Sequence, residues 1–214
     1  MVLNEKIKAQ TGTRLKALPN PVRLAVFTQE ANCRFCSENR HMAEEVAALA
    51  PDKVQLEVWD FATDTEKARE LNIERVPAIA VLGEKDYGIR FYGVPAGFEF
   101  TTFIAALELA SGHDSGLKPE TRERLKALTK PVDLKVFTTL TCPICPLAVN
   151  VAHRLAMESD LITASVIDSA EFPELAAQCN VMGVPRTIVN NAYSFEGALP
   201  EERFVEEVLK GATT

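Results

Sequence analysis

The stretch Thr139-Leu140-Thr141-Cys142-Pro143-Ile144-Cys145-Pro146-Leu147-Ala148-Val149 places two cysteines three residues apart between two contrasting patterns. The apolar run from Leu134 to Phe137 before it predicts a buried strand, and the spacing of apolar residues from Leu147 to Met157 predicts a helix. In a helix, Cα atoms three residues apart are separated by about 5 Å. That separation lies within the window of roughly 4.4–6.8 Å that a disulfide accepts. The pair can therefore close and open with little movement of the backbone.

The two cysteines are expected to have different roles. Unpaired N–H groups and the macrodipole at a helix N-terminus stabilise an anion, so we expect Cys142 to form a thiolate there. The thiolate is the attacking species, which makes Cys142 the candidate nucleophile. Cys145, one turn further on and more covered, is the candidate resolving thiol. Pro143 and Pro146 suit the first turn, where a missing N–H costs little.

Composition narrows the class of protein. The chain has 214 residues, of which 47% are hydrophobic and 25% are charged, with a formal net charge of -7. These values are typical of a globular protein of one or two domains. The acidic balance argues against nucleic acid or an anionic membrane as a general partner, because both require a basic patch. Met1 to Leu18 lacks the apolar core of a signal peptide, so we expect a cytoplasmic protein.

The five cysteines favour redox chemistry over a structural framework. Four form two C-x-x-C pairs, Cys33/Cys36 and Cys142/Cys145, and Cys179 stands alone. In a reducing compartment such pairs are catalytic or metal-binding more often than structural. A joint zinc site has the right number of ligands. However, the pairs are more than 100 residues apart, whereas zinc ribbons bring theirs within about 15–20 residues. We therefore expect no metal.

The order of apolar runs and breakers predicts the elements of the first half. A helix-like pattern ends at the prolines that follow Leu18, and a capping-box pattern, Thr63-Asp64-Thr65-Glu66, predicts the start of a short helix. The expected elements are helix Asn4–Leu18, strand Val22–Thr28, a helix from Cys33 to Leu49, strand Val54–Trp59, a helix to about Asn72, strand Val76–Val81, strand Ile89–Gly93 and a helix from about Phe98 to Gly112.

The second half repeats the first. Arg14 to Thr28 aligns with Arg124 to Thr138, and eleven of the fifteen positions are identical. The same register carries the first C-x-x-C onto the second, Val76-Pro77 onto Val184-Pro185, and the last helix onto Glu201–Lys210, with Gly211 as its expected cap. The chain is therefore a tandem duplication of about 100 residues per copy, long enough for each copy to have its own core.

The repeat fixes the expected domains and fold class. The polar, glycine-containing stretch 111–116 predicts a boundary, with domains at residues 1–116 and 117–214. The order βαβαββα in each half predicts an α/β protein of two tandem domains, each a four-stranded mixed sheet flanked by helices.

These motifs resemble the thioredoxin and glutaredoxin fold. A C-x-x-C between the first strand and first helix, with Val-Pro some 40 residues later, is typical of that fold, and Cys142-Pro143-Ile144-Cys145 is similar to the Cys-Pro-Tyr-Cys of glutaredoxins. The whole chain resembles the protein disulfide oxidoreductases, tandem glutaredoxin-like proteins of thermophiles. In the first motif, Arg34 and Phe35 replace the usual Pro-Tyr, so the two sites are expected to differ in reduction potential and in role.

The resemblance also implies roles for the Val-Pro pairs. In this fold the proline is cis and faces the cysteines, so cis bonds are expected at Val76-Pro77 and Val184-Pro185, with their backbones binding an extended substrate. Thioredoxin itself carries a buried aspartate in the strand before its cysteines. The strands before the cysteines are apolar here, with Phe27 in the first half and Val136 in the second, so this base is missing or is supplied from elsewhere.

We therefore expect a protein thiol–disulfide oxidoreductase that reduces and oxidises protein disulfides, with isomerisation as a further role. Cys142, Cys145, Cys33 and Cys36 are its expected catalytic residues, with no cofactor. Its expected partners are protein disulfides and, as electron donor, a thioredoxin-reductase-like flavoprotein. Two alternatives stay open: a dedicated dithiol electron carrier between a flavoprotein reductase and a peroxidase, and a zinc-binding scaffold.

Overall fold

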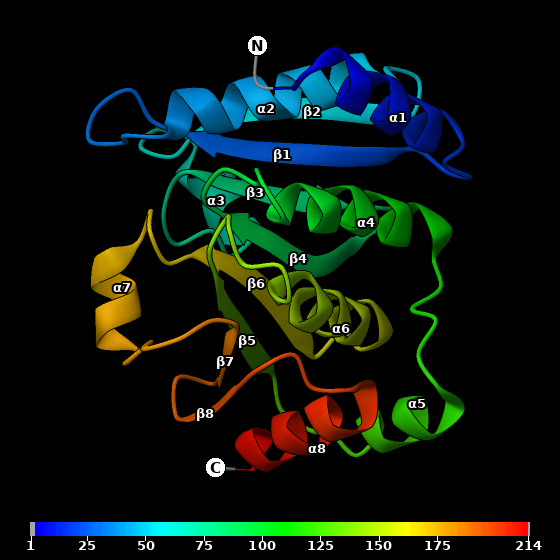
Figure 1. Cartoon of the computed structure of the whole chain (residues 1–214), viewed down its shortest axis with the longest axis vertical. Helices are drawn as coiled ribbons and strands as arrows, with labels where there is room; N and C mark the ends of the chain where they lie inside the picture. The colour runs from blue at the N-terminus through cyan, green and yellow to red at the C-terminus, as the bar shows by residue number, and fades with distance from the viewer. Residues whose placement is uncertain (1–2, 214) are drawn as a thin grey trace.

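The computed structural model describes residues 3–213 and consists of two similar halves that follow one another along the chain (Figure 1). The elements of the first half are α1 Glu5–Lys16, β1 Val22–Thr28, α2 Cys36–Ala48, β2 Val54–Asp60, α3 Thr65–Glu70, β3 Ala78–Leu82, β4 Asp86–Tyr92 and α4 Glu99–Gly112. Those of the second half are α5 Pro119–Leu125, β5 Val132–Thr138, α6 Cys145–Glu158, β6 Ile162–Asp168, α7 Pro173–Gln178, β7 Arg186–Val189, β8 Tyr193–Glu196 and α8 Glu201–Ala212. After the leading helix of each half, this order is the predicted βαβαββα, given twice.

The two halves share one continuous sheet. Its strand order is β2-β1-β3-β4-β6-β5-β7-β8, so each half contributes four neighbouring strands. Within each half the first two strands pair in parallel and the others pair antiparallel, which gives the predicted mixed sheet. The halves join where β4 pairs in parallel with β6, from Ile89 opposite Ala164 to Tyr92 opposite Ile167.

Alternate side chains of the central strands enter two separate cores, as the two-residue period of a strand requires. On β1, Leu24 and Val26 belong to the larger core, which includes residues of α2, α4, α6 and α8 from both halves. Ala25 and Phe27 point to the other face and meet the short helices α3 and α7. Figure 1 shows the long helices together in front of the sheet. The central strands are buried on both faces, which explains their continuous apolar runs.

The predicted positions of the helix starts need correction. α2 begins at Cys36 and α6 at Cys145, so in each motif the first cysteine lies three residues before the helix rather than in its first turn. Pro143 therefore lies outside α6, whereas Pro146 is in its first turn. The loop before the helix holds Cys142 because its N–H bonds back to the carbonyl of Thr139 instead of continuing a helix.

Two predicted caps are also wrong. No side-chain cap is formed at the start of α3, because Asp64 instead accepts a hydrogen bond from the N–H of Asp60 at 2.8 Å. Gly211 lies inside α8 rather than beyond its end. A Cβ atom at Gly211 would lie 2.6 Å from the Cβ of Val189 on β7, so close packing of the helix on the strand requires the glycine there.

Among the described residues, no helix is long and apolar enough to cross a membrane.

Candidate active sites

Each C-x-x-C motif forms a disulfide at the carboxyl end of the first strand of its half. Cys33 is bonded to Cys36 after β1, and Cys142 to Cys145 after β5, with a Cα–Cα separation of 5.5 Å in both pairs. This separation lies within the range expected from the spacing. We refer to them as the first centre and the second centre.

The second centre is prepared to hold a negatively charged sulfur. The N–H of Cys145, at the start of α6, donates a hydrogen bond to the Sγ atom of Cys142 at 3.1 Å. In the reduced protein, a backbone N–H at a helix start stabilises a thiolate that it contacts. Cys142 is 7% exposed, whereas Cys145 is fully buried. The helix start therefore stabilises the sulfur of Cys142, the less buried of the two cysteines, even though Cys142 itself lies before the helix.

The Val-Pro pairs occupy the same position in both halves. Both Val76-Pro77 and Val184-Pro185 are cis, as expected from the sequence. The Val184 carbonyl oxygen lies 4.0 Å from the Sγ atom of Cys142, so this backbone lies directly beside the second centre. Pro77 and Pro185 each accept a hydrogen bond from the glycine that follows the next hairpin strand, Gly93 and Gly197 respectively.

Several exposed apolar side chains belong to segments that form or contact the second centre. Among the described residues, the large apolar side chains that remain exposed are Val58, Phe98, Ile144, Leu147 and Met182. Ile144 and Leu147 flank Cys145 in the sequence, and Met182 precedes the Val184-Pro185 pair. The N–H of Phe98 bonds to Leu140, two residues before Cys142, at 3.0 Å. An apolar rim of this kind suits contact with exposed apolar segments of another protein.

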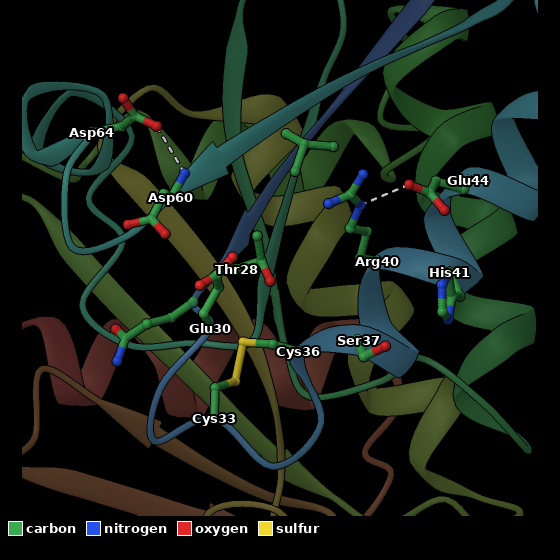
Figure 2. A pocket seen from close by; sticks show the side chains of 12 residues that line it. Thr28, Glu30, Cys33, Cys36, Ser37, Arg40, His41, Glu44, Asp60 and Asp64 are labelled. Carbon is green, nitrogen blue, oxygen red and sulfur yellow. Dashed lines mark hydrogen bonds and ion pairs between the residues drawn. A yellow bond between two sulfur atoms is a disulfide. The ribbon is translucent and has the colours of Figure 1, made fainter.

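The first centre has polar surroundings instead. A groove of about 560 Å³ is bounded by the disulfide, by side chains of α2 and by the end of β2. Figure 2 shows Asp60 and Asp64 on one side of this groove, and Arg40 with its partner Glu44 on the other. Arg34 is exposed and stacks over the Phe35 ring at 4.9 Å from its centroid.

A cluster of carboxyl groups, of which Glu99 and Asp168 are buried and Glu171 is half-buried, lies where the two halves meet, and the sequence did not reveal it. Burial raises the pKa of Glu99 to about 7, against weaker opposing hydrogen bonds from Thr102 and Thr138. Burial also raises the pKa of Glu171 to about 7 and that of Asp168 above its usual range. Glu99, Thr138 and Asp168 line one small cavity at the strand ends from which the second-centre loop leaves.

The first half thus supplies part of the second centre's surroundings. The segment 93–99, which comprises the connection from β4 to α4 and the first residue of α4, donates the N–H of Val94 to the Glu171 carboxylate at 2.8 Å. It also carries Glu99 and the Phe98 contact with Leu140. Glu99 is the candidate for the base that Val136 cannot provide. No local pattern marks it, because it comes from the other half of the chain.

The other titratable and nucleophilic residues have structural positions. His153 is buried against the Phe91 ring, with 5.2 Å between ring centroids, and burial lowers its pKa to about 3. His41 is exposed beside the groove of the first centre, and Glu30 also lines that groove. Cys179 is half-buried and forms no disulfide.

The four motif cysteines are paired within each half, so the structure does not assemble them into a joint zinc site. Among residues 3–213, no group of three or more His, Cys, Asp or Glu side chains is arranged to hold a metal ion.

Comparison with known proteins agrees with this architecture. Residues 132–210 match the family model described as a thioredoxin domain. A crystal structure of a protein disulfide oxidoreductase from Aeropyrum pernix superposes with a TM-score of 0.92 at 29% identity, covering 100% of this chain and 95% of that one. The chain is a tandem thioredoxin-fold protein. The predicted fold class and the resemblance to the protein disulfide oxidoreductases are confirmed.

A second group of relatives consists of alkyl hydroperoxide reductases. The NTD_N/C domain of alkylhydroperoxide reductase AhpF from Enterococcus faecalis superposes with a TM-score of 0.88 at 25% identity, covering 96% of this chain and 99% of that one. The corresponding alkyl hydroperoxide reductase component of Escherichia coli is 26% identical over 99% of this tandem thioredoxin-fold chain. The chain spans only 38% of that relative's length, and 39% of a Bacillus subtilis NADH dehydrogenase that is 28% identical.

Proposed function

We propose that the protein is a thiol–disulfide oxidoreductase acting on protein disulfides, with the second centre as its principal site. The hydrogen bond from the Cys145 N–H to the Cys142 sulfur is the observation that supports this most directly, because it prepares Cys142 for attack. The similarity of the full chain to a protein disulfide oxidoreductase supports the same reaction.

The reaction at the second centre proceeds in two exchanges. In the reduced protein the Cys142 thiolate forms a bond to one sulfur of the substrate disulfide, and the other substrate sulfur leaves as a thiolate. Cys145 then loses its proton and attacks Cys142, which releases the first substrate sulfur and closes the Cys142–Cys145 disulfide. The substrate gains two electrons from the two cysteine sulfurs and two protons, one released by Cys145 and one taken from solvent. Glu99, whose pKa is about 7, is the proposed acceptor for the Cys145 proton.

Substrate recognition at this centre combines apolar contact with main-chain pairing. The apolar rim of Phe98, Ile144, Leu147 and Met182 would bind exposed apolar side chains. The Val184-Pro185 backbone beside Cys142 would pair with an extended segment of the substrate, and Val76-Pro77 has the corresponding role at the first centre. These features suit proteins with unfolded or exposed segments around their disulfides.

The two centres are too far apart for direct exchange. β1 and β5 are separated by four inter-strand steps in the sheet, which is roughly 19 Å at about 4.8 Å per step. Electrons would therefore pass between the centres through a shared substrate rather than by contact of their sulfurs. Isomerisation, in which one centre holds a substrate that the other oxidises or reduces, fits this separation.

A second candidate function is that of an electron carrier between a flavoprotein reductase and a peroxidase. The alignment of nearly the whole chain with part of the alkyl hydroperoxide reductase components favours it. In either role we propose a thioredoxin-reductase-like flavoprotein as the electron donor and the cytoplasm as the compartment, because a dithiol that donates electrons needs a reducing pool.

Insulin reduction driven by dithiothreitol tests the proposal. We expect Cys142→Ser to lower turnover by more than about tenfold, because it removes the attacking thiolate. Cys33→Ser should lower it by about twofold or less. Cys145→Ser should accumulate a mixed disulfide between Cys142 and insulin, detectable by mass spectrometry. Equal losses from Cys33→Ser and Cys142→Ser would show that the centres are equivalent, and turnover that survives both changes together would rule out the proposed chemistry.

A further inference from the structure

The repeat provides an internal template for the groove at the first centre. In the first half Val26–Thr28 pairs with Val58–Asp60, and in the second half Val136–Thr138 pairs with Val166–Asp168 in the same register. The ends of β2 and β6 are therefore equivalent positions, and each lies beside the C-x-x-C motif of its own half. What covers one of them shows what shape of ligand the other can accept.

In the second half this position is occupied by the chain itself. β4 pairs along the outer side of β6, with Phe91 opposite Val166 and Tyr92 opposite Ile167. Beyond the strand, the segment 93–99 continues past Asp168 toward Leu140 in the loop of the second centre. As a result Val166 is only 4% exposed. An extended segment running parallel to β6 thus fills the space beside the second centre.

In the first half the equivalent space is open. β2 is an end strand of the sheet and pairs only with β1 among the described residues. Val58, the counterpart of Val166, is 38% exposed and lines the groove together with Cys33 and Cys36. The outer main-chain groups of an end strand are available for pairing with an added strand. The groove therefore combines a free strand edge with a disulfide.

The side chains of the groove differ from those of the filled position in charge. Arg40 and Glu44 on α2 correspond by spacing from the cysteines to Val149 and His153 on α6, both of which are buried. The groove carries four carboxyl groups, which are Glu30, Glu44, Asp60 and Asp64. Within residues 3–213, Arg40 is the only lysine or arginine that lines it, and it is ion-paired with Glu44 at 2.7 Å. The groove is therefore net negative.

We propose that this groove docks an extended segment of a partner protein that carries lysine or arginine beside its cysteine. The segment would run parallel to β2, as β4 does along β6, and its basic side chains would meet the four carboxylates. This orientation would bring the partner's sulfur to Cys33. The inference rests on the proposed function, since it names the class of substrate for one of the two centres: basic for the first, apolar for the second.

The test uses the full chain with Cys142→Ser and Cys145→Ser, so that only the first centre can react. Two synthetic peptides carry a single cysteine capped as a disulfide with thionitrobenzoate, one with lysines and one with glutamates at the flanking positions. The protein is reduced with dithiothreitol and desalted, and single-turnover release of thionitrobenzoate is followed by absorbance. A further Cys33→Ser change provides the blank, which includes any reaction of Cys179.

We expect the lysine peptide to react about tenfold faster at low ionic strength, with the advantage shrinking as salt screens the charges. Glu30→Gln with Glu44→Gln should reduce this preference to about twofold. The matched control is Glu120→Gln with Glu123→Gln on α5, which makes the same change in net charge at exposed positions near the opposite end of the sheet (Figure 1). The control should keep the full preference.

Three results would overturn the docking proposal: equal rates for the two peptides, a preference that survives in the groove variant, or a preference that the control variant also loses. Absence of release at the first centre would overturn it as well. In that case the full chain with Cys33→Ser and Cys36→Ser, in which only the second centre can react, separates the docking proposal from the proposed function. Release of thionitrobenzoate by this variant would leave the proposed function standing.

Discussion

Glu99 is a carboxylic acid that is only 2% exposed, and burial raises its pKa to about 7. Between its usual pKa of about 4.3 and this value, the folded protein holds a proton that the unfolded chain has lost. Stability must therefore fall as the pH rises through this window, by about 4 kcal/mol in total. Glu99→Gln should remove this part of the pH dependence.

Urea unfolding at pH 5 and pH 8 measures the effect. The parent protein should lose about 2.5 kcal/mol more than Glu99→Gln between the two values, since part of the effect lies below pH 5. An identical loss in both proteins would mean that Glu99 is ionised with little cost in the folded state. If Glu99 also accepts the Cys145 proton, insulin reduction by the variant should be slower and should lose its dependence on pH near 7.

His153 contributes a pH dependence of stability of the opposite sign to that of Glu99. Burial lowers its pKa to about 3, so the folded protein keeps it neutral while the unfolded chain binds a proton below about pH 6.5. Stability is therefore lost as the pH falls from 6.5, by about 2 kcal/mol at pH 5. His153→Phe keeps an aromatic ring against Phe91 and should abolish this loss. Thermal unfolding of both proteins between pH 7 and pH 5 tests it, and a parallel decline would contradict the assignment.

At the scale of elements, the turn between β4 and α4 depends on one glycine. Gly97 has a φ of 56°, and a Cβ atom there would overlap the carbonyl oxygen of Leu140 in the second-centre loop. Gly97→Ala should therefore destabilise the protein by about 1–3 kcal/mol and slow the second centre more than the first. Unfolding and single-centre exchange assays measure the two effects.

Gly116 is the matched control for this turn, because its φ of 60° is similar but its nearest neighbour to a new Cβ is 3.7 Å away. Gly116→Ala should destabilise the protein by only about 1 kcal/mol, which is the energy of placing an alanine in the left-handed conformation. Equal effects of the two substitutions would show that the approach to Leu140 is unimportant.

The packing of α8 on β7 gives a second element-scale prediction. Alanine favours a helix interior over glycine by about 1 kcal/mol. At Gly211, however, a Cβ would lie 2.6 Å from the Cβ of Val189. Overpacking should therefore outweigh the gain, and Gly211→Ala should destabilise by about 1–3 kcal/mol. Gly112→Ala in the last turn of α4 meets nothing within 4 Å and should be neutral or stabilising. The urea midpoints of the two variants, each compared with the parent protein, show whether helix propensity or overpacking dominates at each position.

For the whole molecule, the shared sheet makes each half dependent on the other. Separation at the proposed boundary, as residues 1–116 and 117–214, would expose the edges of β4 and β6 and the buried face around Val166. We expect the second half alone to be less stable and to self-associate, because a long unpaired edge beside apolar residues is prone to pairing. Light scattering and urea unfolding test this, and a monomer as stable as the intact chain would contradict it.

Much of the fold of this protein could be predicted from local sequence patterns. The repeat of Arg14–Thr28 at Arg124–Thr138 and the alternation of strands and helices predicted two α/β halves. The C-x-x-C and Val-Pro motifs predicted the thioredoxin fold by resemblance. The same patterns predicted both cis prolines by resemblance. These features are encoded within a few neighbouring residues or within one repeat, so sequence order alone carries them.

Tertiary structure decided the rest, because it depends on contacts between segments that are distant in the chain. The pairing of β4 with β6 merges the halves, buries Glu99 and His153, and leaves the equivalent edge of β2 open beside Cys33. The charge of Glu30, Glu44, Asp60 and Asp64 is visible in the sequence, but their convergence on one groove is not. Burial and the pKa shifts it causes are properties of packed surroundings, and no periodicity in a single segment specifies which distant segment will provide them.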